Sequence, residues 1–222
     1  MEIEMKAILT PEQFSDLLAK YAEKITVTET KTDTYFSKYD TYEERKANKE
    51  NVFRIRESSM ETTPVFTYKK KLVENGVEKN VELETLISNI KDFISILSFE
   101  GYKPYFKKKK TSFGFLENII EPNYVKDGDF VISHSFGVKA HVEIEVINDK
   151  IFAVEVEVIY NPPIAMTSND SYPTEWQIAD ALKEWFTKNG LSDKIDDRSW
   201  ITIIKEAEKN ANNNCSGTSQ CS

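Results

Sequence analysis

The sequence predicts an α+β fold built on a closed antiparallel β-barrel of about eight strands with flanking helices. In many segments hydrophobic and charged residues alternate with a period of two, which is typical of strands. Hairpin-length turns separate several of these segments, which favours antiparallel pairing. Alternate positions often carry charges of one sign. Such charges repel on an open sheet face, whereas a closed barrel can set acidic strands opposite basic ones.

The first elements are a strand and a capped helix. Residues 2–8 alternate in the manner of a strand. In the following segment Thr10 is suited to the N-cap, Pro11 to the first helical position, and Gln13 completes a capping box, so a helix is expected to about residue 21. Strands are expected next at residues 32–37 and 52–57, and the polar segment 39–50 is predicted to be a loop or a short helical turn.

The middle of the chain combines a hairpin with a helix. Residues 65–72 and 79–85 alternate again, and Asn75-Gly76 between them is a strong hairpin signal. Residues 86–100 carry apolar side chains at helical spacing, and Gly101 has the position of a C′ residue. A strand is expected at residues 105–113, and residues 116–135 are expected to hold an inserted hairpin.

Two long strands and two helices are predicted toward the C-terminus. Residues 139–147 and 151–160 flank a tight turn at residues 148–150. Thr174 is expected to cap a helix that ends at Gly190, and a short helix is expected over residues 199–209. The chain is therefore predicted to form one domain over residues 1–209, with a possible insertion at residues 114–140.

The last residues, 210–222, form a polar segment without aromatics, which predicts a disordered tail. It contains the two cysteines of the chain, Cys215 and Cys221, too few and too peripheral for a disulfide framework. A reactive or metal-binding cysteine pair is the alternative.

Composition limits the classes of partner. The formal net charge of −8 argues against non-specific binding to long nucleic acid or to an anionic membrane. No apolar run is long enough to span a bilayer, and the first residues lack a basic leader with an apolar core, so we expect a cytoplasmic protein. The oligomeric state is left open.

The charged pairs of the strands indicate a chemistry. The carboxylate pairs are Glu2/Glu4, Glu82/Glu84, Glu143/Glu145 and Glu155/Glu157, and the basic pairs are Arg54/Arg56, Lys69/Lys71 and Lys108/Lys110. Mg²⁺ and Mn²⁺ prefer carboxylate oxygens, whereas arginine and lysine suit phosphate oxygens. Phosphoryl transfer needs both, so cleavage of a polyphosphate is predicted. A site that binds metal or phosphate without catalysis would use the same residues, and a ligand-free barrel would leave the same-sign pairs unexplained.

The order of these motifs resembles a known family. Its members share an ExExK start, a DxY(F/Y) strand, a KxRxx(Y/F) segment and a late (F/Y)VExE strand. The corresponding segments here are Glu2-x-Glu4-x-Lys6, Asp33-x-Tyr35-Phe36, Arg54-x-Arg56, Thr67-x-Lys69, Glu82-x-Glu84, Lys108-x-Lys110-x-x-Phe113, Val154-Glu155-Val156-Glu157, Asn189-Gly190-Leu191 and Arg198-Ser199-Trp200. Over about residues 1–206 the chain resembles the CYTH, or triphosphate tunnel metalloenzyme, family.

The resemblance implies a small triphosphate substrate held in the barrel and hydrolysed with Mg²⁺ or Mn²⁺. Inorganic, thiamine and nucleoside triphosphates are the candidate substrates. The family also contains class IV adenylate cyclases, which make cyclic AMP and pyrophosphate from ATP, so this activity is an alternative. A non-catalytic triphosphate or polyphosphate binder is another alternative.

The resemblance also assigns expected site residues. The expected metal ligands are Glu2, Glu4, Glu145, Glu155 and Glu157, and the expected phosphate ligands are Lys6, Arg54, Arg56, Lys69, Lys108 and Lys110. Lys6, Glu2 and Glu4 are the residues expected at the reaction centre. Lys6 is expected to bind phosphate rather than to act as a base, because a carboxylate-rich site opposes loss of its proton.

A second alignment takes Glu143 and Glu145 as the ExE pair and leaves the next strand structural. The chain also departs from the family pattern, since Lys110 stands where arginine is usual and Glu145 where aspartate is usual. Lys107 and Lys109 are expected on the outer face of their strand. His134 and His141 are expected to have ordinary structural roles.

Overall fold

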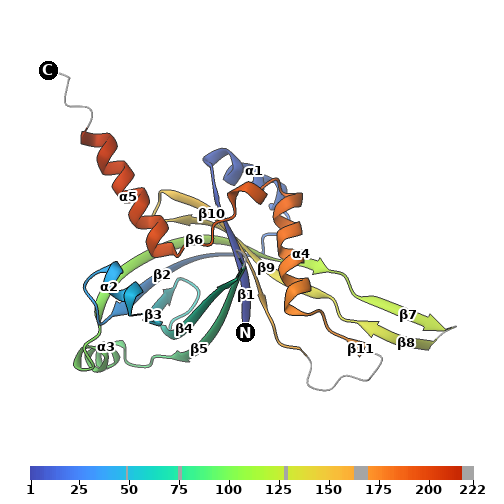
Figure 1. Cartoon of the computed structure of the whole chain (residues 1–222), viewed down its shortest axis with the longest axis horizontal. Helices are drawn as coiled ribbons and strands as arrows, with labels where there is room; N and C mark the ends of the chain where they lie inside the picture. Colours follow the sequence, from blue (N-terminus) through green and yellow to red (C-terminus); the bar gives the residue numbers. More distant parts are fainter. Residues whose placement is uncertain (49, 75–76, 128–129, 163–169, 217–222) are drawn as a thin grey trace.

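A closed β-barrel forms the centre of the molecule (Figure 1). The computed structural model describes residues 1–48, 50–74, 77–127, 130–162 and 170–216. Within them, eight antiparallel strands follow the order β1-β10-β9-β6-β2-β3-β4-β5, and β5 pairs back to β1. The barrel strands are β1 (Glu2–Leu9), β2 (Val27–Ser37), β3 (Val52–Ser58), β4 (Val65–Glu74), β5 (Val77–Leu86), β6 (Lys103–Ile120), β9 (Val138–Ile147) and β10 (Ile151–Ile159). The predicted α+β barrel is confirmed.

Three helices lie between barrel strands in the sequence, and the others come after the last barrel strand, β10. They are α1 (Pro11–Tyr21), α2 (Tyr42–Ala47), α3 (Ile90–Phe99), α4 (Glu175–Lys188) and α5 (Trp200–Ser216), with the short 3₁₀ helix η1 (Ser192–Lys194). The capping box of α1 is present as predicted, with the Thr10 side chain accepting from the Gln13 amide. Gly101 and Gly190 follow α3 and α4 with φ of 83° and 68°, which glycine adopts readily.

Some predicted boundaries were wrong. Helix α3 begins at Ile90 rather than residue 86, because Asn89 caps it by accepting from the Asp92 amide and residue 86 still belongs to β5. Strand β2 starts five residues earlier than predicted and β6 runs seven residues further, since each pairs with a long neighbour. The predicted turn at Asn75-Gly76 lies outside the described residues, although β4 and β5 pair as a hairpin.

The inserted hairpin and the C-terminal segment complete the chain. The hairpin consists of β7 (Asn123–Asp127) and β8 (Phe130–Ser135), which β11 (Asp170–Ser171) joins in parallel to β8 at a distance from the barrel (Figure 1). Helix α5 runs to Ser216 and so takes in the first part of segment 210–222, for which the sequence predicted a disordered tail; the helix contains no glycine or proline. Cys215 lies in this helix, and Cys221 lies outside the described residues.

The main hydrophobic core lies outside the barrel. Outward-facing residues of β1, β9 and β10, such as Met5, Ile144 and Val156, pack against α1 and α4, whose contributions include Leu182 and Phe186. Because strand side chains alternate between faces, this outer core leaves the charged positions pointing inward. No helix in the described part of the chain is long and apolar enough to cross a membrane.

Candidate functional site

The barrel encloses a cavity of about 540 Å³ with a charged lining. All predicted site residues except Glu145 line it, and Glu145 is fully buried in the barrel wall. The lining residues among those predicted are Glu2, Glu4, Lys6, Arg54, Arg56, Lys69, Lys108, Lys110, Glu155 and Glu157. Lys107 and Lys109 are exposed, as expected for the outer face of β6.

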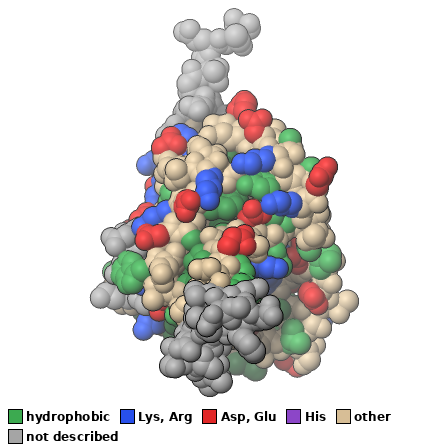
Figure 2. Space-filling view, turned by 90° about the vertical axis from the view of Figure 1, so that its right-hand side faces the viewer, with side chains coloured by type: hydrophobic (Ala, Val, Ile, Leu, Met, Phe, Trp, Pro, Cys, Tyr) green, Lys and Arg blue, Asp and Glu red, His purple; other side chains and the backbone are tan. Residues whose placement is uncertain are grey.

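The signs of the lining charges are separated between two halves of the barrel. Strands β5, β1, β10 and β9 are neighbours and supply carboxylates, whereas β6, β2, β3 and β4 are neighbours and supply lysines and arginines. Lys6 of β1 is the exception among the lining strand residues. On the outer face in Figure 2, acidic and basic side chains are instead intermixed. The inward-facing charges are therefore ordered to contact a ligand that has both positive and negative parts.

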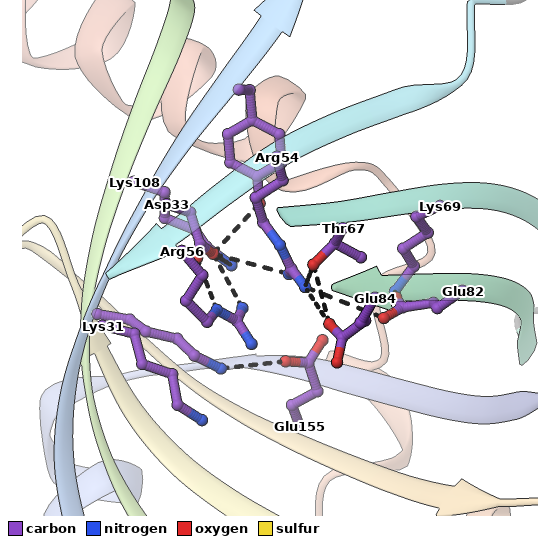
Figure 3. A network of polar contacts seen from close by, with 12 residues as sticks. Lys31, Asp33, Arg54, Arg56, Thr67, Lys69, Glu82, Glu84, Lys108 and Glu155 are labelled. Atoms are coloured by element: carbon purple, nitrogen blue, oxygen red, sulfur yellow. Dashed lines mark hydrogen bonds and ion pairs between the residues drawn. The ribbon is translucent and has the colours of Figure 1, made fainter. Parts of the chain in front are cut away.

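Asp33 organises the basic half (Figure 3). This side chain is fully buried and accepts hydrogen bonds from Arg56 Nε at 2.7 Å and from the Arg56 terminal nitrogen Nη2 at 3.0 Å. Lys108 Nζ lies 3.6 Å and an Arg54 Nη1 nitrogen 3.9 Å from the same carboxylate. Although burial opposes the shift, Arg56 and Arg54 hold the pKa of Asp33 well below its ordinary value. Asp33 therefore stays charged and fixes three cations on one wall.

The first carboxylate cluster consists of Glu2, Glu4 and Glu157, whose nearest oxygens lie within 4.8 Å of one another. Lys69 Nζ reaches two of them, at 3.2 Å from Glu2 and 3.3 Å from Glu4. Burial raises the pKa of Glu2 to about 8 and that of Glu4 well above its ordinary value, although Lys69 opposes both shifts. Lys69 therefore supplies too little positive charge to offset the burial of Glu2 and Glu4.

The second cluster consists of Glu143, Glu145 and Glu155, again with oxygens within 4.8 Å. Lys110 Nζ contacts Glu143 and Glu145 and lies 3.7 Å from Glu155. Although burial opposes the shift, Lys110 and Lys31 hold the pKa of Glu143 well below its ordinary value. Burial raises the pKa of Glu145 to about 8 despite Lys110.

Three buried strand residues, Arg54, Asn80 and Glu145, carry side-chain atoms without a hydrogen-bond partner among the described residues. Glu145 Oε2 accepts no hydrogen bond, and Arg54 Nε donates none. A buried orphan acceptor beside two other carboxylates suits a cation, and a buried orphan donor on the basic wall suits an anion. The carboxylate clusters thus fit a divalent cation, which Glu2, Glu4 and Glu157, or Glu143, Glu145 and Glu155, would hold.

Lys6 pairs with Glu78 at 2.6 Å and lies across the β1–β10 pair from Glu155 of the second cluster. Although burial opposes the shift, Glu78 raises the pKa of Lys6, so the side chain is an ammonium group at neutral pH. The ring of Trp200 lies 5.8 Å from its Nζ atom and 5.1 Å from that of Lys108. Trp200 also lines the cavity.

The sequence prediction missed several residues of this site. Lys31 and Glu78 line the cavity but lie just outside the predicted strands 32–37 and 79–85. If these strands had been extended to the observed bounds of β2 and β5, the period of two would have placed both residues on the inward face. Glu143 was given a ligand role only in the second alignment. The structure brings Glu143 and Glu145 together with Glu155, so one cluster holds residues from both alignments. His141 lies 3.3 Å from Glu157, and the side chain of His134 lies outside the described residues.

Comparison with known proteins identifies the family. The CYTH domain model matches residues 1–157, more than half of the chain. The chain belongs to the CYTH domain family. This family includes triphosphatases and class IV adenylate cyclases, binds triphosphate substrates and is metal-dependent. No curated protein matches the chain.

Solved structures share the CYTH fold at low sequence identity. The PH1819 protein of Pyrococcus horikoshii is 17% identical, with a TM-score of 0.64, over 93% of this chain and 99% of that one. A conserved hypothetical protein of Pyrococcus furiosus is 18% identical, with a TM-score of 0.61, over 91% and 99%. HpAC1 of Hippeastrum, described as having a dominant triphosphatase activity, is 14% identical, with a TM-score of 0.53, over 93% and 96%. At these identities the likeness establishes the fold alone.

Proposed function

We propose that this CYTH protein is a divalent-metal-dependent phosphohydrolase that cleaves a triphosphate inside its barrel. The observation that carries the proposal is the separation of the cavity lining into an acidic half and a basic half. A linear polyphosphate with a bound metal ion has the complementary distribution of charge. Burial of so many ionised groups is costly without such a ligand, which supports a functional origin for the arrangement.

The basic half would position the phosphates. Arg54 and Arg56 present guanidinium groups that suit phosphate oxygens, and Asp33 fixes both of them in place. Lys108 and Lys110 add ammonium groups from β6. The lysine that replaces the usual arginine, Lys110, donates as a point charge and cannot form a bidentate contact.

The acidic half would hold the metal. A divalent cation bound there would supply neutralisation of charge on the non-bridging phosphate oxygens. In the hydrolysis a water oxygen forms a bond to phosphorus as a bridging P–O bond breaks, the proton of the water passes to the leaving oxygen or to solvent, and two shorter phosphates are released. Lys6 would donate to a phosphate oxygen or orient this water, because its raised pKa makes it a poor base.

Turnover assays test the proposal. The purified protein is incubated with ATP, thiamine triphosphate or inorganic triphosphate and with Mg²⁺ or Mn²⁺, and the products are separated by chromatography. We expect metal-dependent phosphate release that Glu4→Gln and Glu157→Gln abolish. Lys108→Gln should reduce it, whereas Lys107→Gln, on the outer face of the same strand, should not. Pyrophosphate with cyclic AMP would instead place the protein with the class IV cyclases, and binding without turnover would make it a binding protein.

A further inference from the structure

Arg45 of helix α2 lines the barrel cavity, although no motif of the sequence marked it. It belongs to the polar segment 39–50, which the sequence predicted to be a loop or a short helical turn. Helix α2 connects β2 to β3 and lies beside their ends (Figure 1). The Arg45 side chain therefore reaches the cavity near the end of β2 and the start of β3, where Tyr35 and Val52 also line it.

A buried carboxylate holds Arg45 in place. Arg45 Nε donates to Glu50 Oε2 at 3.0 Å. Glu50 is itself fixed, because it accepts from the Ser37 hydroxyl at 2.7 Å and from the Lys38 amide at 2.9 Å. On another side, the guanidinium carbon of Arg45 lies 5.8 Å from the centre of the Tyr105 ring of β6. These contacts position the guanidinium group through its Nε atom and its face.

The terminal nitrogens of Arg45, Nη1 and Nη2, have no hydrogen-bond or ion-pair partner among the described residues, although the residue is only 7% exposed. The other two arginines of the cavity lining each have a terminal nitrogen that is occupied. Arg56 Nη2 donates to Asp33 at 3.0 Å. Arg54 Nη2 donates to Thr67 at 3.0 Å. Because buried donors normally have partners, the terminal nitrogens of Arg45 suit an acceptor inside the cavity.

The geometry of a guanidinium group identifies this acceptor. The N–H groups of Nη1 and Nη2 form a planar fork whose two parallel donors match two oxygens of one phosphate group. A lysine cannot make this contact, since its ammonium group is a point charge. Lys110 is moreover occupied, because its Nζ atom contacts the carboxylates of the second cluster. Arg45 thus offers a contact that the lysines of the cavity do not.

We propose that Arg45 is a further phosphate-binding residue of the barrel, which donates two parallel hydrogen bonds from Nη1 and Nη2 to one phosphate group of the substrate. This inference rests on the proposed function, because it takes the ligand of the cavity to be a triphosphate. Glu50 does not line the cavity and acts through Arg45, so it is a positioning residue. The segment between β2 and β3 thereby joins the barrel strands in recognition of the substrate.

Two variants of the same ion pair separate a ligand contact from a purely structural one. Arg45→Gln and Glu50→Gln both remove the ion pair, but only Arg45→Gln removes the donors offered to the cavity. Binding of inorganic triphosphate is measured by titration calorimetry at 5 °C, once in Mg²⁺ and once in EDTA. We expect Arg45→Gln to weaken binding by about tenfold to a hundredfold, as for loss of a charged hydrogen bond. Glu50→Gln, whose amide oxygen can still accept from Arg45 Nε, should cause a loss at least about fivefold smaller.

A conservative variant and a control complete the set. Arg45→Lys keeps the positive charge but loses the pair of parallel donors, so its affinity should lie between those of the wild type and Arg45→Gln. Lys107→Gln removes a cation from the exposed outer face of β6 and should bind inorganic triphosphate as the wild type does. If Arg45→Gln does not fold, Arg45→Lys still decides, because wild-type affinity in Arg45→Lys would contradict the paired contact.

The outcomes distinguish this inference from the proposed function. Equal affinity of the wild type and Arg45→Gln, or an equal loss in Arg45→Gln and Glu50→Gln, would overturn the phosphate contact of Arg45 and leave the proposed function intact. Failure of the wild-type protein to bind inorganic triphosphate under either condition would overturn both.

Discussion

The buried carboxylate of Asp33 provides a quantitative test of the basic wall. Asp33→Asn preserves the size of the side chain but removes the charge that faces Arg56 at 2.7 Å, Arg54 at 3.9 Å and Lys108 at 3.6 Å. Removal of one partner from a buried ion pair costs about 3–5 kcal/mol, because the other charge stays buried. For a chain of this size each kcal/mol corresponds to roughly 2–4 °C in Tm, so a decrease of about 6–20 °C is expected.

Thermal unfolding followed by circular dichroism measures this decrease. Asp180→Asn is the control. This aspartate is 78% exposed, and its ion pair with Lys183, at 3.7 Å, lies at the surface, so the free energy of unfolding should change by less than about 0.5 kcal/mol. The pKa of Asp33 is lowered in the folded state, so its contribution is complete at neutral pH and is lost as the pH falls below the ordinary value of 3.8. The difference between wild type and Asp33→Asn should therefore shrink in acid. A loss of under 2 °C at pH 7 would refute the view that Asp33 holds the basic wall together.

Three further predictions concern the acidic half. Lys6→Met should raise KM for the triphosphate by about tenfold to a hundredfold through loss of a charged hydrogen bond, and Lys6→Arg should bring KM most of the way back to the wild-type value. Steady-state kinetics would contradict this if both variants had the KM of the wild type. Without metal, Tm should fall as the pH rises from about 5 to 8, because Glu2 and Glu145, with pKa values of about 8, bind protons that the unfolded chain releases. Excess Mg²⁺ should remove this dependence of Tm on pH. A metal-free Tm that does not change between pH 5 and 8 would contradict the prediction. Glu143→Gln and Glu155→Gln should weaken Mn²⁺ binding in calorimetry by similar factors, about tenfold or more, whereas an effect of Glu155→Gln alone would make Glu143 structural.

Much of the fold was predictable because local signals agreed with the final structure. Period-two alternation predicted the strands, and the residues at Thr10 and Gln13 predicted the start of α1. Alternation also predicted which side chains share a face, so Arg54 and Arg56 were correctly paired. Such signals need only neighbouring residues.

The composition of each cluster could not be predicted, because it depends on which strands are neighbours. Glu157 joins Glu2 and Glu4 only because β10 pairs with β1, about 150 residues away in the sequence. Asp33 could be recognised as part of a motif, but its role as a buried counter-ion depends on Lys108 being brought beside it by β6. These contacts follow from closure of the barrel.

The position of Trp200 at the cavity was hidden for a different reason. The sequence placed Trp200 in the motif Arg198-Ser199-Trp200 but did not indicate that this motif lines a cavity. Its placement depends on the bridge of Ile195 with Ala7 and on the contact of Thr202 with Tyr42. Both are contacts between distant parts of the chain.

The central claim is that the two halves of the cavity bind a metal ion and a triphosphate together. Calorimetric titration of inorganic triphosphate at 5 °C, in Mg²⁺ and in EDTA, tests it most directly. The account predicts binding at least about tenfold tighter with Mg²⁺, a coupling of about 1.4 kcal/mol, and its loss in Glu4→Gln. Equal affinity with and without metal would contradict the account.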